Sequence, residues 1–373
     1  MADVLPATAQ TYRGLDEIAA LFDEWQAASL RHGRNRPYCG AGYGMAVLET
    51  YHKDDDPVVV VARGADGQLR GLMPLVRRDL VRMGLRVREY GFPNNPNVIL
   101  NDPLVAAGDN AALVALLGAI DLGQDSLILD HMPAVAGLAS GMGGAAAGLR
   151  LTQDAPRPAR SLYFATLGGS YDDFLATRSR NHRWQLKKTI RKAEEAGALE
   201  VRRYRGGEIR AALPDWWAVE QRSWQGQNPA SAMDDADRAF HTALLDRLQP
   251  EELGDLWITM MEGRPVAALR MLAAPGVVSV HTMHFDAGYR KQAPGLIAFD
   301  AMFRAACEEG LTEVDMHGRT EFFTRWATGQ RAHETLRLYR GGIKGGLIRR
   351  GRQASLRLSG LAQKCKTPAK AEG

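Results

Sequence analysis

The two halves of the sequence repeat one order of predicted elements: a hairpin, a further strand, a helix and a last strand. Apolar, β-branched runs flank the turns at Asp66-Gly67 and at Gly263, and a helical periodicity follows each hairpin. The predicted segments are 57–63, 69–76, 86–92, 110–120 and 126–131 in the first half, and 255–261, 265–273, 276–286, 295–309 and 312–317 in the second. Two strands that are connected by a crossover helix pair in parallel within one sheet. We therefore predict an α/β fold with two lobes, each a mixed twisted β-sheet flanked by helices.

The length of the chain agrees with two lobes. It has 373 residues, and domains usually have about 100–200. Pro156 and Pro158 mark a linker between the halves. We expect the first lobe at 1–158, the second at 159–345 and a basic tail at 346–373.

Composition excludes several classes of protein. With 45% hydrophobic and 24% charged residues, the chain is neither wholly disordered nor a coiled coil nor collagen. It shows no strongly apolar window of about 18 residues and no signal-peptide pattern at its start. The cysteines, Cys39, Cys307 and Cys365, are odd in number and far apart, which argues against a disulfide framework and against a cysteine zinc site. We expect a cytoplasmic protein.

Positive charge is concentrated in two segments. The net charge is +4, yet residues 178–205 hold 10 Lys and Arg against 3 Glu, and residues 337–373 hold 10 against 1. Such clusters attract phosphates, an anionic lipid surface or nucleic acid. Nucleic acid is the weakest of these partners, because the basic residues lack an aromatic stacking platform and no DNA-binding motif is present.

The strand at 276–286 leads into a basic loop that opens the next helix. Backbone N–H groups and the dipole at a helix N-terminus favour phosphate. Arg290, Lys291 and Gln292 lie in the loop, and Gly295 permits a close backbone approach. These four residues are the candidate cofactor-binding set; the alternative is an ordinary strand–turn–helix junction.

Several segments in this order resemble the GNAT acyltransferase superfamily. They are GRPVAA at 263–268, VHTMHFDAGYRKQAPG at 280–295, EVDMHG at 313–318 and the basic helix at 179–197. Within the superfamily they are similar to the branch of the cellulose-biosynthesis acetyltransferases, distantly related to FemAB-type transferases. The match covers roughly 162–329, and the first half resembles a degenerate second copy, so the resemblance implies two tandem GNAT-like lobes.

The resemblance implies an acyl-CoA donor with its pyrophosphate on the loop 290–295. Two features depart from the family. A Pro-Gly pair replaces the spaced glycines of the common pattern Q/R-x-x-G-x-G/A, and Phe322-Phe323 stand where the branch often has Tyr-Lys.

Acyl transfer to an amine needs a base, and histidine suits this task near neutral pH. The candidate catalytic residues are His317, His284, His281 and Asp315. His281 and His284 are three apart on one strand, so we expect them on opposite faces of the sheet. Asp315 and His317 are two apart and share a face. The alternative for each histidine is a core position.

Candidate acceptor-binding residues are Glu220, Trp224 and Tyr289. Glu220 and Trp224 share a helical face, which predicts an acceptor wall or, alternatively, a tryptophan packing face. Tyr289 is placed to donate to a leaving thiolate or to anchor its loop. No metal is expected, because the histidines lack the spacing of known metal motifs.

The acceptor stays open among several classes. Segments 178–192 and 347–366 mix apolar residues with cations, a pattern that is typical of contact with an anionic membrane. The protein would then lie peripherally at the inner face of the membrane. This favours a lipid amine, as in the bacterial ceramide synthases that the resemblance includes. The alternatives are an amino sugar or exopolysaccharide acceptor, FemAB-like transfer from aminoacyl-tRNA, and a basic binding scaffold without catalysis.

Overall fold

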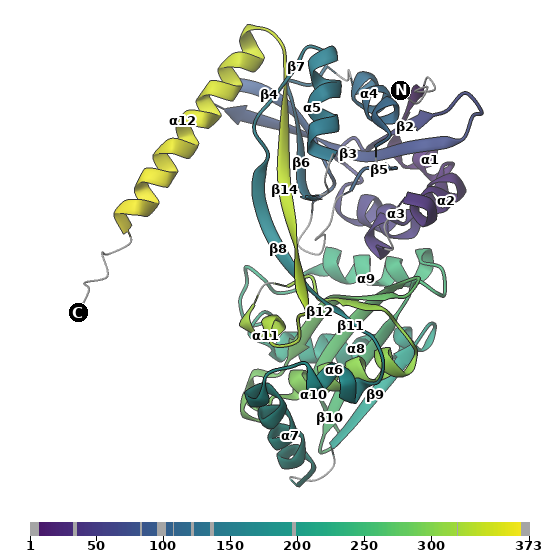
Figure 1. Cartoon of the computed structure of the whole chain (residues 1–373), viewed down its shortest axis with the longest axis vertical. Coiled ribbons are helices and arrows are strands. Elements are labelled where there is room, and N and C mark those ends of the chain that lie inside the picture. The colour runs from purple at the N-terminus through teal and green to yellow at the C-terminus, as the bar shows by residue number, and fades with distance from the viewer. Residues whose placement is uncertain are drawn as a thin grey trace.

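The computed structural model shows two lobes joined by one continuous sheet (Figure 1). It describes residues 7–32, 36–82, 84–94, 102–106, 108–120, 123–134, 138–195, 199–318 and 320–366. Side chains are described at these positions except at 160 and 357–366.

The sheet has 14 strands in the part of the chain described. The first lobe contributes β1 (Thr8–Arg13), β2 (Val58–Arg63), β3 (Leu69–Arg82), β4 (Leu85–Gly91), β5 (Leu104–Val105), β6 (Ser126–Pro133) and β7 (Leu151–Gln153). The remaining strands are β8 (Arg157–Thr166), β9 (Leu199–Arg205), β10 (Asp255–Met261), β11 (Arg264–Ala274), β12 (Val277–Phe285), β13 (Glu313–Asp315) and β14 (Gly329–Arg340).

The strand order confirms the predicted repeat. It runs β1-β2-β3-β4-β6-β14-β8-β13-β12-β11-β10-β9, with β5 beside β3 and β7 beside β14. Each lobe has a hairpin, a further strand and a parallel strand after a helix: β4 pairs in parallel with β6, and β12 with β13. The two lobes share a single sheet because β14, from the C-terminal part of the chain, pairs with β6 on one side and β8 on the other.

Helices cover both faces of each half of the sheet. The first lobe has α1 (Gly14–Ala19), α2 (Phe22–His32), η1 (Pro37–Cys39), α3 (Ala41–Tyr51), α4 (Asn110–Ala119) and α5 (Leu138–Gly148). The second has α6 (Tyr171–Ala176), α7 (Arg180–Glu195), α8 (Glu208–Arg222), α9 (Asp235–Arg247), η2 (Ala287–Gln292), α10 (Pro294–Glu308) and α11 (Glu321–Thr324), and α12 (Ile343–Lys366) follows β14. Helix α10 packs on β12 within one core, and α8 packs on β10 and β11 within another.

Some elements differ from the sequence prediction. The basic helix at 179–197 is α7, which begins after Ser179, whose hydroxyl accepts from the His182 amide. A separate short helix, α6, precedes it and is capped by Ser170. Residues 196 and 197 lie outside the described residues. Strands β1 and β14 and helix α3 were not predicted.

The two lobes also touch through helices α3 and α9. The Tyr51 hydroxyl donates to Asp237 at 2.6 Å, and Arg247 pairs with Glu49 at 2.6 Å. At Gly42 a Cβ atom would lie 2.4 Å from the Arg247 carbonyl oxygen, so glycine permits this close approach. The first lobe is thus in direct contact with the helices that cover one face of the second.

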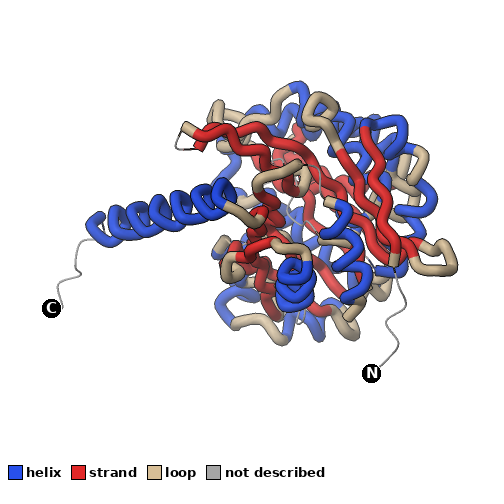
Figure 2. Tube along the Cα trace, turned by 90° about the horizontal axis from the view of Figure 1, so that it is seen from above, coloured by secondary structure: helices blue, strands red, loops and turns tan. Residues whose placement is uncertain are grey.

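Helix α12 leaves the body of the protein, and both Figure 1 and Figure 2 show it projecting outward. Its first part is anchored on the first lobe, where Lys344 pairs with Asp125 and Arg349 pairs with Asp154, each at 2.7 Å. None of the described helices is long and apolar enough to cross a membrane.

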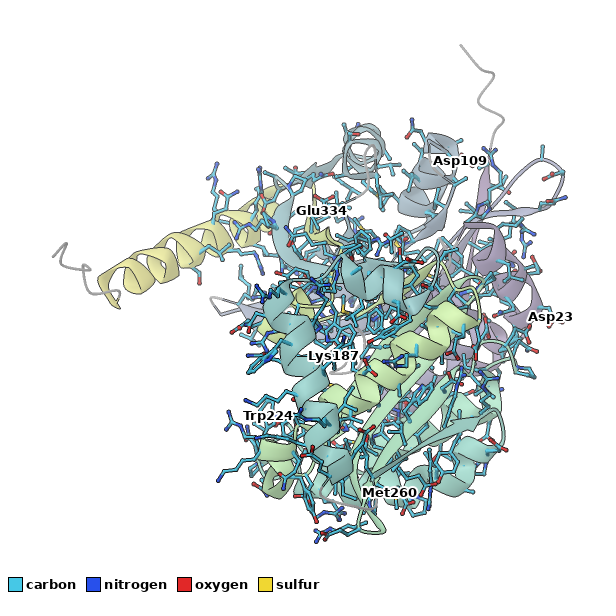
Figure 3. The ribbon with its side chains drawn as sticks, turned by 60° about the horizontal axis from the view of Figure 1, so that its bottom comes forward. Asp23, Asp109, Lys187, Trp224, Met260 and Glu334 are labelled. Carbon is cyan, nitrogen blue, oxygen red and sulfur yellow. The ribbon has the colours of Figure 1, made fainter. Side chains whose placement is uncertain are left out.

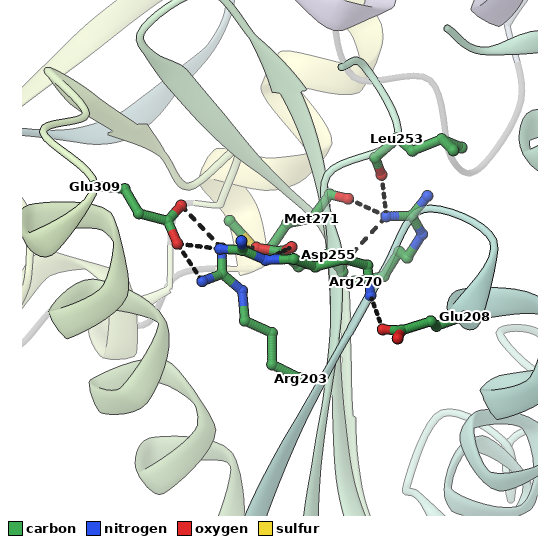
Figure 4. A network of polar contacts seen from close by, with 8 residues as sticks. Arg203, Glu208, Leu253, Asp255, Arg270, Met271 and Glu309 are labelled. Atoms are coloured by element: carbon green, nitrogen blue, oxygen red, sulfur yellow. Dashed lines mark hydrogen bonds and ion pairs between the residues drawn. The ribbon is translucent and has the colours of Figure 1, made fainter. Parts of the chain in front are cut away.

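A buried arginine ties together the backbone beside β10 and β11. Arg270 is 2% exposed, and its Nη1 donates to the carbonyl oxygens of Leu253, Asp255 and Met271 (Figure 4). Arg203 of β9 also pairs with Asp255, at 2.6 Å. These bonds hold β9, β10 and β11 in register.

Candidate active site

Parallel strands β12 and β13 separate at the centre of the second lobe. They pair only from Val277 to Ser279, opposite Glu313 to Asp315, where β13 ends while β12 runs on to Phe285. A cavity of about 540 Å³ opens where they diverge. This is an ordinary size for a small-molecule site, about 300–1,000 Å³. A gap between diverging parallel strands therefore defines the candidate site.

The cavity reaches residues on both faces of the sheet. Met316 belongs to the core beneath α10, and Met283 packs against that core. On the other face of the sheet, His281 packs against His241 of α9. The wall also includes His317 and Arg290. A ligand in the cavity would therefore reach from the basic loop to the histidines through the gap in the sheet.

A β-bulge corrects the prediction that His281 and His284 point to opposite faces. The pairing of β11 with β12 shifts between Arg270 and Met271, which leaves His281 as an extra residue. His284 lies opposite Ala268, which packs with α8, and His281 contacts α9. Both rings consequently face the layer formed by α8 and α9.

Asp315 and His317 form a close pair. His317 has a left-handed backbone with φ 48°, which returns its ring toward the strand, and its Nε2 lies 3.2 Å from Asp315 Oδ1. The His317 amide also donates to that oxygen at 3.2 Å. Among the described residues, neither ring nitrogen of His317 has a hydrogen-bond partner, so the 3.2 Å contact of Nε2 with Asp315 Oδ1 is an ion-pair approach. The imidazole thus lies beside a carboxylate and keeps its ring nitrogens for a ligand.

The charges around Asp315 keep it ionised. Burial alone would raise its pKa, but His317, Arg36 and Arg331 together hold the pKa well below its usual range. The Arg36 Nη1 lies 3.0 Å from Asp315 Oδ2, and the Arg331 Nη1 lies 3.6 Å from it. A buried carboxylate beside an imidazole is an arrangement that can orient the ring and stabilise its charged form.

The other two predicted histidines differ in their surroundings. His281 lines the cavity, and burial lowers its pKa well below the usual value, so it stays neutral. Both of its ring nitrogens are without partners in the described part of the chain. His284 is not part of the cavity wall; its Nδ1 accepts from Trp216 Nε1 at 3.1 Å, and burial lowers its pKa to about 4. His284 therefore has a packing role in this structure.

The basic loop lies at one end of the cavity. Arg290 and Gly295 line the cavity, whereas Lys291 and Gln292 are exposed beside it. Within the described part of the chain, neither Arg290 nor Lys291 pairs with a carboxylate. Ala293, with φ 49°, takes the left-handed position just before α10 begins. Two cations free of internal partners at a helix N-terminus are suited to phosphate.

The three predicted acceptor residues are not brought together. Trp224 is 57% exposed and lines the cavity. Glu220 is 1% exposed, and its Oε1 accepts from the Met233 amide at 3.0 Å, which secures the chain after α8. Tyr289 packs against the small core around Val266 and does not line the cavity.

The aromatic wall of the cavity was not predicted from the sequence. It is built by Phe322, Phe323 and Trp326, with His182 and Gln185 of α7 beside them. Trp326 follows Phe322 by four residues and Phe323 by three, which are the spacings at which side chains in a helical turn lie side by side. That spacing, together with the Phe322-Phe323 departure from the family, was the available signal.

No metal centre is formed by the residues that the structure describes. They include no group of three or more His, Cys, Asp or Glu side chains placed to hold an ion. The histidines around the cavity are instead arranged in pairs with aromatic rings and one carboxylate, as for His317 with Tyr38 and Asp315.

The fold and the domain identify the class of protein. Residues 180–326 match the family described as "Acetyltransferase (GNAT) domain". No curated protein matches the sequence. The chain therefore contains a GNAT acetyltransferase domain, and its arrangement of two lobes is similar to that of FemX. The domain is of an acyltransferase class.

Three solved structures share this architecture over nearly their whole length. FemX matches with a TM-score of 0.61 and 12% identity, covering 88% of this chain and 97% of that one. The C-terminal domain of a lysylphosphatidylglycerol synthetase from Agrobacterium fabrum matches with 0.56 and 9%, covering 90% and 96%. L-PGS from Bacillus licheniformis matches with 0.53 and 13%, covering 89% and 95%. At these identities the likeness shows the fold alone.

Proposed function

We propose that the protein transfers an acyl group from acyl-CoA to an amine, and that the amine belongs to a lipid. The observation that carries the proposal is the cavity itself. It joins a phosphate-suited loop at Arg290 to the Asp315–His317 pair through a gap in the sheet, and aromatic and apolar side chains form its wall.

The donor would lie along the cavity. Its phosphates would contact the N-terminus of α10 and the cations Arg290 and Lys291. The pantetheine arm would pass Gly295, where an added Cβ would make only ordinary contacts with Met283 and Phe285, at 3.7 and 3.8 Å. The thioester carbonyl would then lie in the gap where β12 and β13 separate.

The chemistry at that carbonyl needs one base. His317 takes a proton from the ammonium of the acceptor, and the free amine nitrogen forms a bond to the carbonyl carbon. The C–S bond then breaks, and the leaving CoA thiolate takes up the second proton that the attacking nitrogen loses, which gives the amide and the free CoA thiol. Asp315 stabilises the imidazolium that His317 becomes.

Two features favour a lipid acceptor over an amino sugar. The cavity wall is aromatic and apolar along Phe322, Phe323 and Trp326, which suits acyl chains and gives a sugar few hydrogen-bond partners. Beside the mouth, α7 exposes Trp184 at 57%, with the Lys188 Nζ 4.5 Å from its ring centroid. Exposed tryptophan among cations is typical of a membrane-surface helix.

The test is calorimetric titration with acetyl-CoA and palmitoyl-CoA, followed by thiol release with sphinganine or glucosamine as acceptor. We expect tighter binding of palmitoyl-CoA and turnover with sphinganine. Arg290→Ala with Lys291→Ala should weaken binding of both donors. The matched control, Lys53→Ala with Arg86→Ala, removes two exposed cations of the first lobe and should leave binding unchanged.

The outcomes separate the alternatives. Preference for acetyl-CoA and turnover with glucosamine would replace the lipid amine by an amino sugar. If neither thioester binds, acyl-CoA is not the donor, and an aminoacyl-tRNA held by the basic face of α7 becomes the hypothesis to test. Equal binding in the Arg290/Lys291 variant and in wild type would overturn the loop assignment.

A further inference from the structure

The first lobe reaches the Asp315–His317 pair with two side chains. Arg36, in the segment before η1, places its Nη1 3.0 Å from Asp315 Oδ2 and 2.9 Å from Glu313 Oε1. The ring of Tyr38, in η1, has its centroid 4.5 Å from that of His317. Residues nearly 280 positions away in the sequence therefore contact both members of the pair.

The contact of Arg36 is a buried one. The side chains of Arg36 and Asp315 are 13% and 4% exposed. Two arginines, Arg36 and Arg331, pair with two carboxylates, Glu313 and Asp315, so the charges balance. Removing one partner from a buried pair leaves an uncompensated charge, and the carboxylate then seeks another cation or shifts.

The contact of Tyr38 fixes the ring plane of His317. Tyr38 is 6% exposed and belongs to a core that Phe240 and Leu244 of α9 complete. His317 has a left-handed backbone, and its imidazole lies beside the Asp315 carboxylate and the ring of Tyr38. The orientation of the ring thus depends on a residue of the other lobe.

We propose that Arg36 and Tyr38 are positioning residues for acyl transfer, so that the first lobe completes the active site of the second. Arg36 holds the Asp315 carboxylate in place and balances its charge, and Tyr38 holds the plane of the His317 ring. The proposal rests on the proposed role of His317 as the base.

The first test separates kcat from KM. Arg36→Met and Tyr38→Leu should each lower kcat about tenfold or more, since small misplacements of a base are costly, while KM for the donor stays within about twofold. Arg36→Lys should restore most of kcat, because a single nitrogen makes both contacts. The matched control is Arg77→Met, which loses an ion pair with Asp79 inside the first lobe and should leave kcat unchanged.

A second readout does not depend on turnover. Side-chain ¹⁵N–¹H NMR spectra of the full chain report the tautomer and protonation of His317. The groups around the ring are Asp315, Tyr38, His281 and His333. Without Arg36 the buried Asp315 carboxylate loses a partner and shifts, so we expect the His317 ring signals to change in Arg36→Met.

The two readouts distinguish the possible failures. If wild type releases no thiol from acyl-CoA but the His317 signals still change in Arg36→Met, the proposed function fails and the positioning survives. If wild type is active and Arg36→Met and Tyr38→Leu change neither kcat nor the His317 signals, the positioning is wrong. Equal loss of activity in Arg36→Met and Arg36→Lys, with unchanged His317 signals, would also overturn it.

Discussion

Replacing Gly318 by alanine should damage both the stability and the cavity of this protein. Gly318 follows His317 and lines the cavity, and the ring of Phe323 lies directly against it. A Cβ atom built at Gly318 would be 1.9 Å from Phe323 Cε2 and 2.1 Å from Cδ2. The ring must therefore retreat by about 1.5 Å to reach 3.4 Å, where ordinary contact begins.

The magnitude follows from two opposing effects. Inserting a methyl group into packed surroundings costs about 1–3 kcal/mol, whereas Gly→Ala stabilises by about 0.4–1 kcal/mol through the unfolded chain. We expect a net loss of about 1–2 kcal/mol in urea unfolding. Because Phe323 is part of the cavity wall, calorimetry should also show about fivefold weaker binding of palmitoyl-CoA, equivalent to about 1 kcal/mol.

Two further variants make the result decisive. Gly144→Ala, in α5, meets nothing within 4 Å and should stabilise by about 0.5–1 kcal/mol. Adding Phe323→Leu to Gly318→Ala should recover stability, because the clash is with the ring. A Gly318→Ala protein with wild-type stability and wild-type donor affinity would refute the packing of Phe323 on Gly318.

Two other perturbations test the buried histidines and the basic helix. Burial lowers the pKa of His241 to about 3 and of His284 to about 4, below the unfolded value of 6.5, so the unfolded chain binds more protons as pH falls. The contribution of each histidine to the free energy of unfolding is complete well above pH 6.5 and is lost as the pH falls below that value. Urea unfolding at pH 5.5 should therefore give a free energy of unfolding lower by about 1.4 kcal/mol for each histidine. An unfolding midpoint that is the same at pH 7.5 and at pH 5.5 would contradict their burial. On helix α7, where Figure 3 labels Lys187, a triple variant replaces three cations by glutamate: Lys187→Glu, Lys188→Glu and Arg191→Glu. This variant should no longer co-sediment with anionic vesicles, whereas its acyl-CoA affinity should stay unchanged. If it still sediments with the vesicles, α7 is not the membrane-facing surface.

The order of elements was predictable because the signal for each was local. The hairpin turns at Asp66-Gly67 and Gly263 have positive φ at glycine, as such turns require. The buried runs that flank them have the length of strands. Strand β14 was not predicted because charged residues such as Arg331 and Glu334 interrupt its apolar pattern. The strand tolerates Arg331 because this residue forms an ion pair with Glu313.

The site was predictable in part. The loop at Arg290 and the sequence Glu-Val-Asp-Met-His-Gly were visible as contiguous segments, and the structure places Arg290 and His317 on one cavity. The prediction that His281 and His284 lie on opposite faces was wrong, because a β-bulge changes the alternation of side chains along the strand. No residue type in the strand indicates where the bulge occurs. The left-handed residue of the loop is likewise Ala293 rather than a glycine.

The contribution of the first lobe could not be predicted, because it depends on a topology that no local pattern encodes. Strand β14 crosses between β6 and β8 and makes the two lobes one sheet, so their relative placement is fixed by backbone hydrogen bonds. Helix α3 then packs against α9, and the segment before it delivers Arg36 and Tyr38 to the end of β13. The first lobe has no comparable basic loop, but through these two side chains it contacts Asp315 and His317 of the second lobe. Asp315 and His317, whose Oδ1 and Nε2 atoms lie 3.2 Å apart, are consequently contacted by side chains of both lobes, as the proposed positioning role of Arg36 and Tyr38 requires.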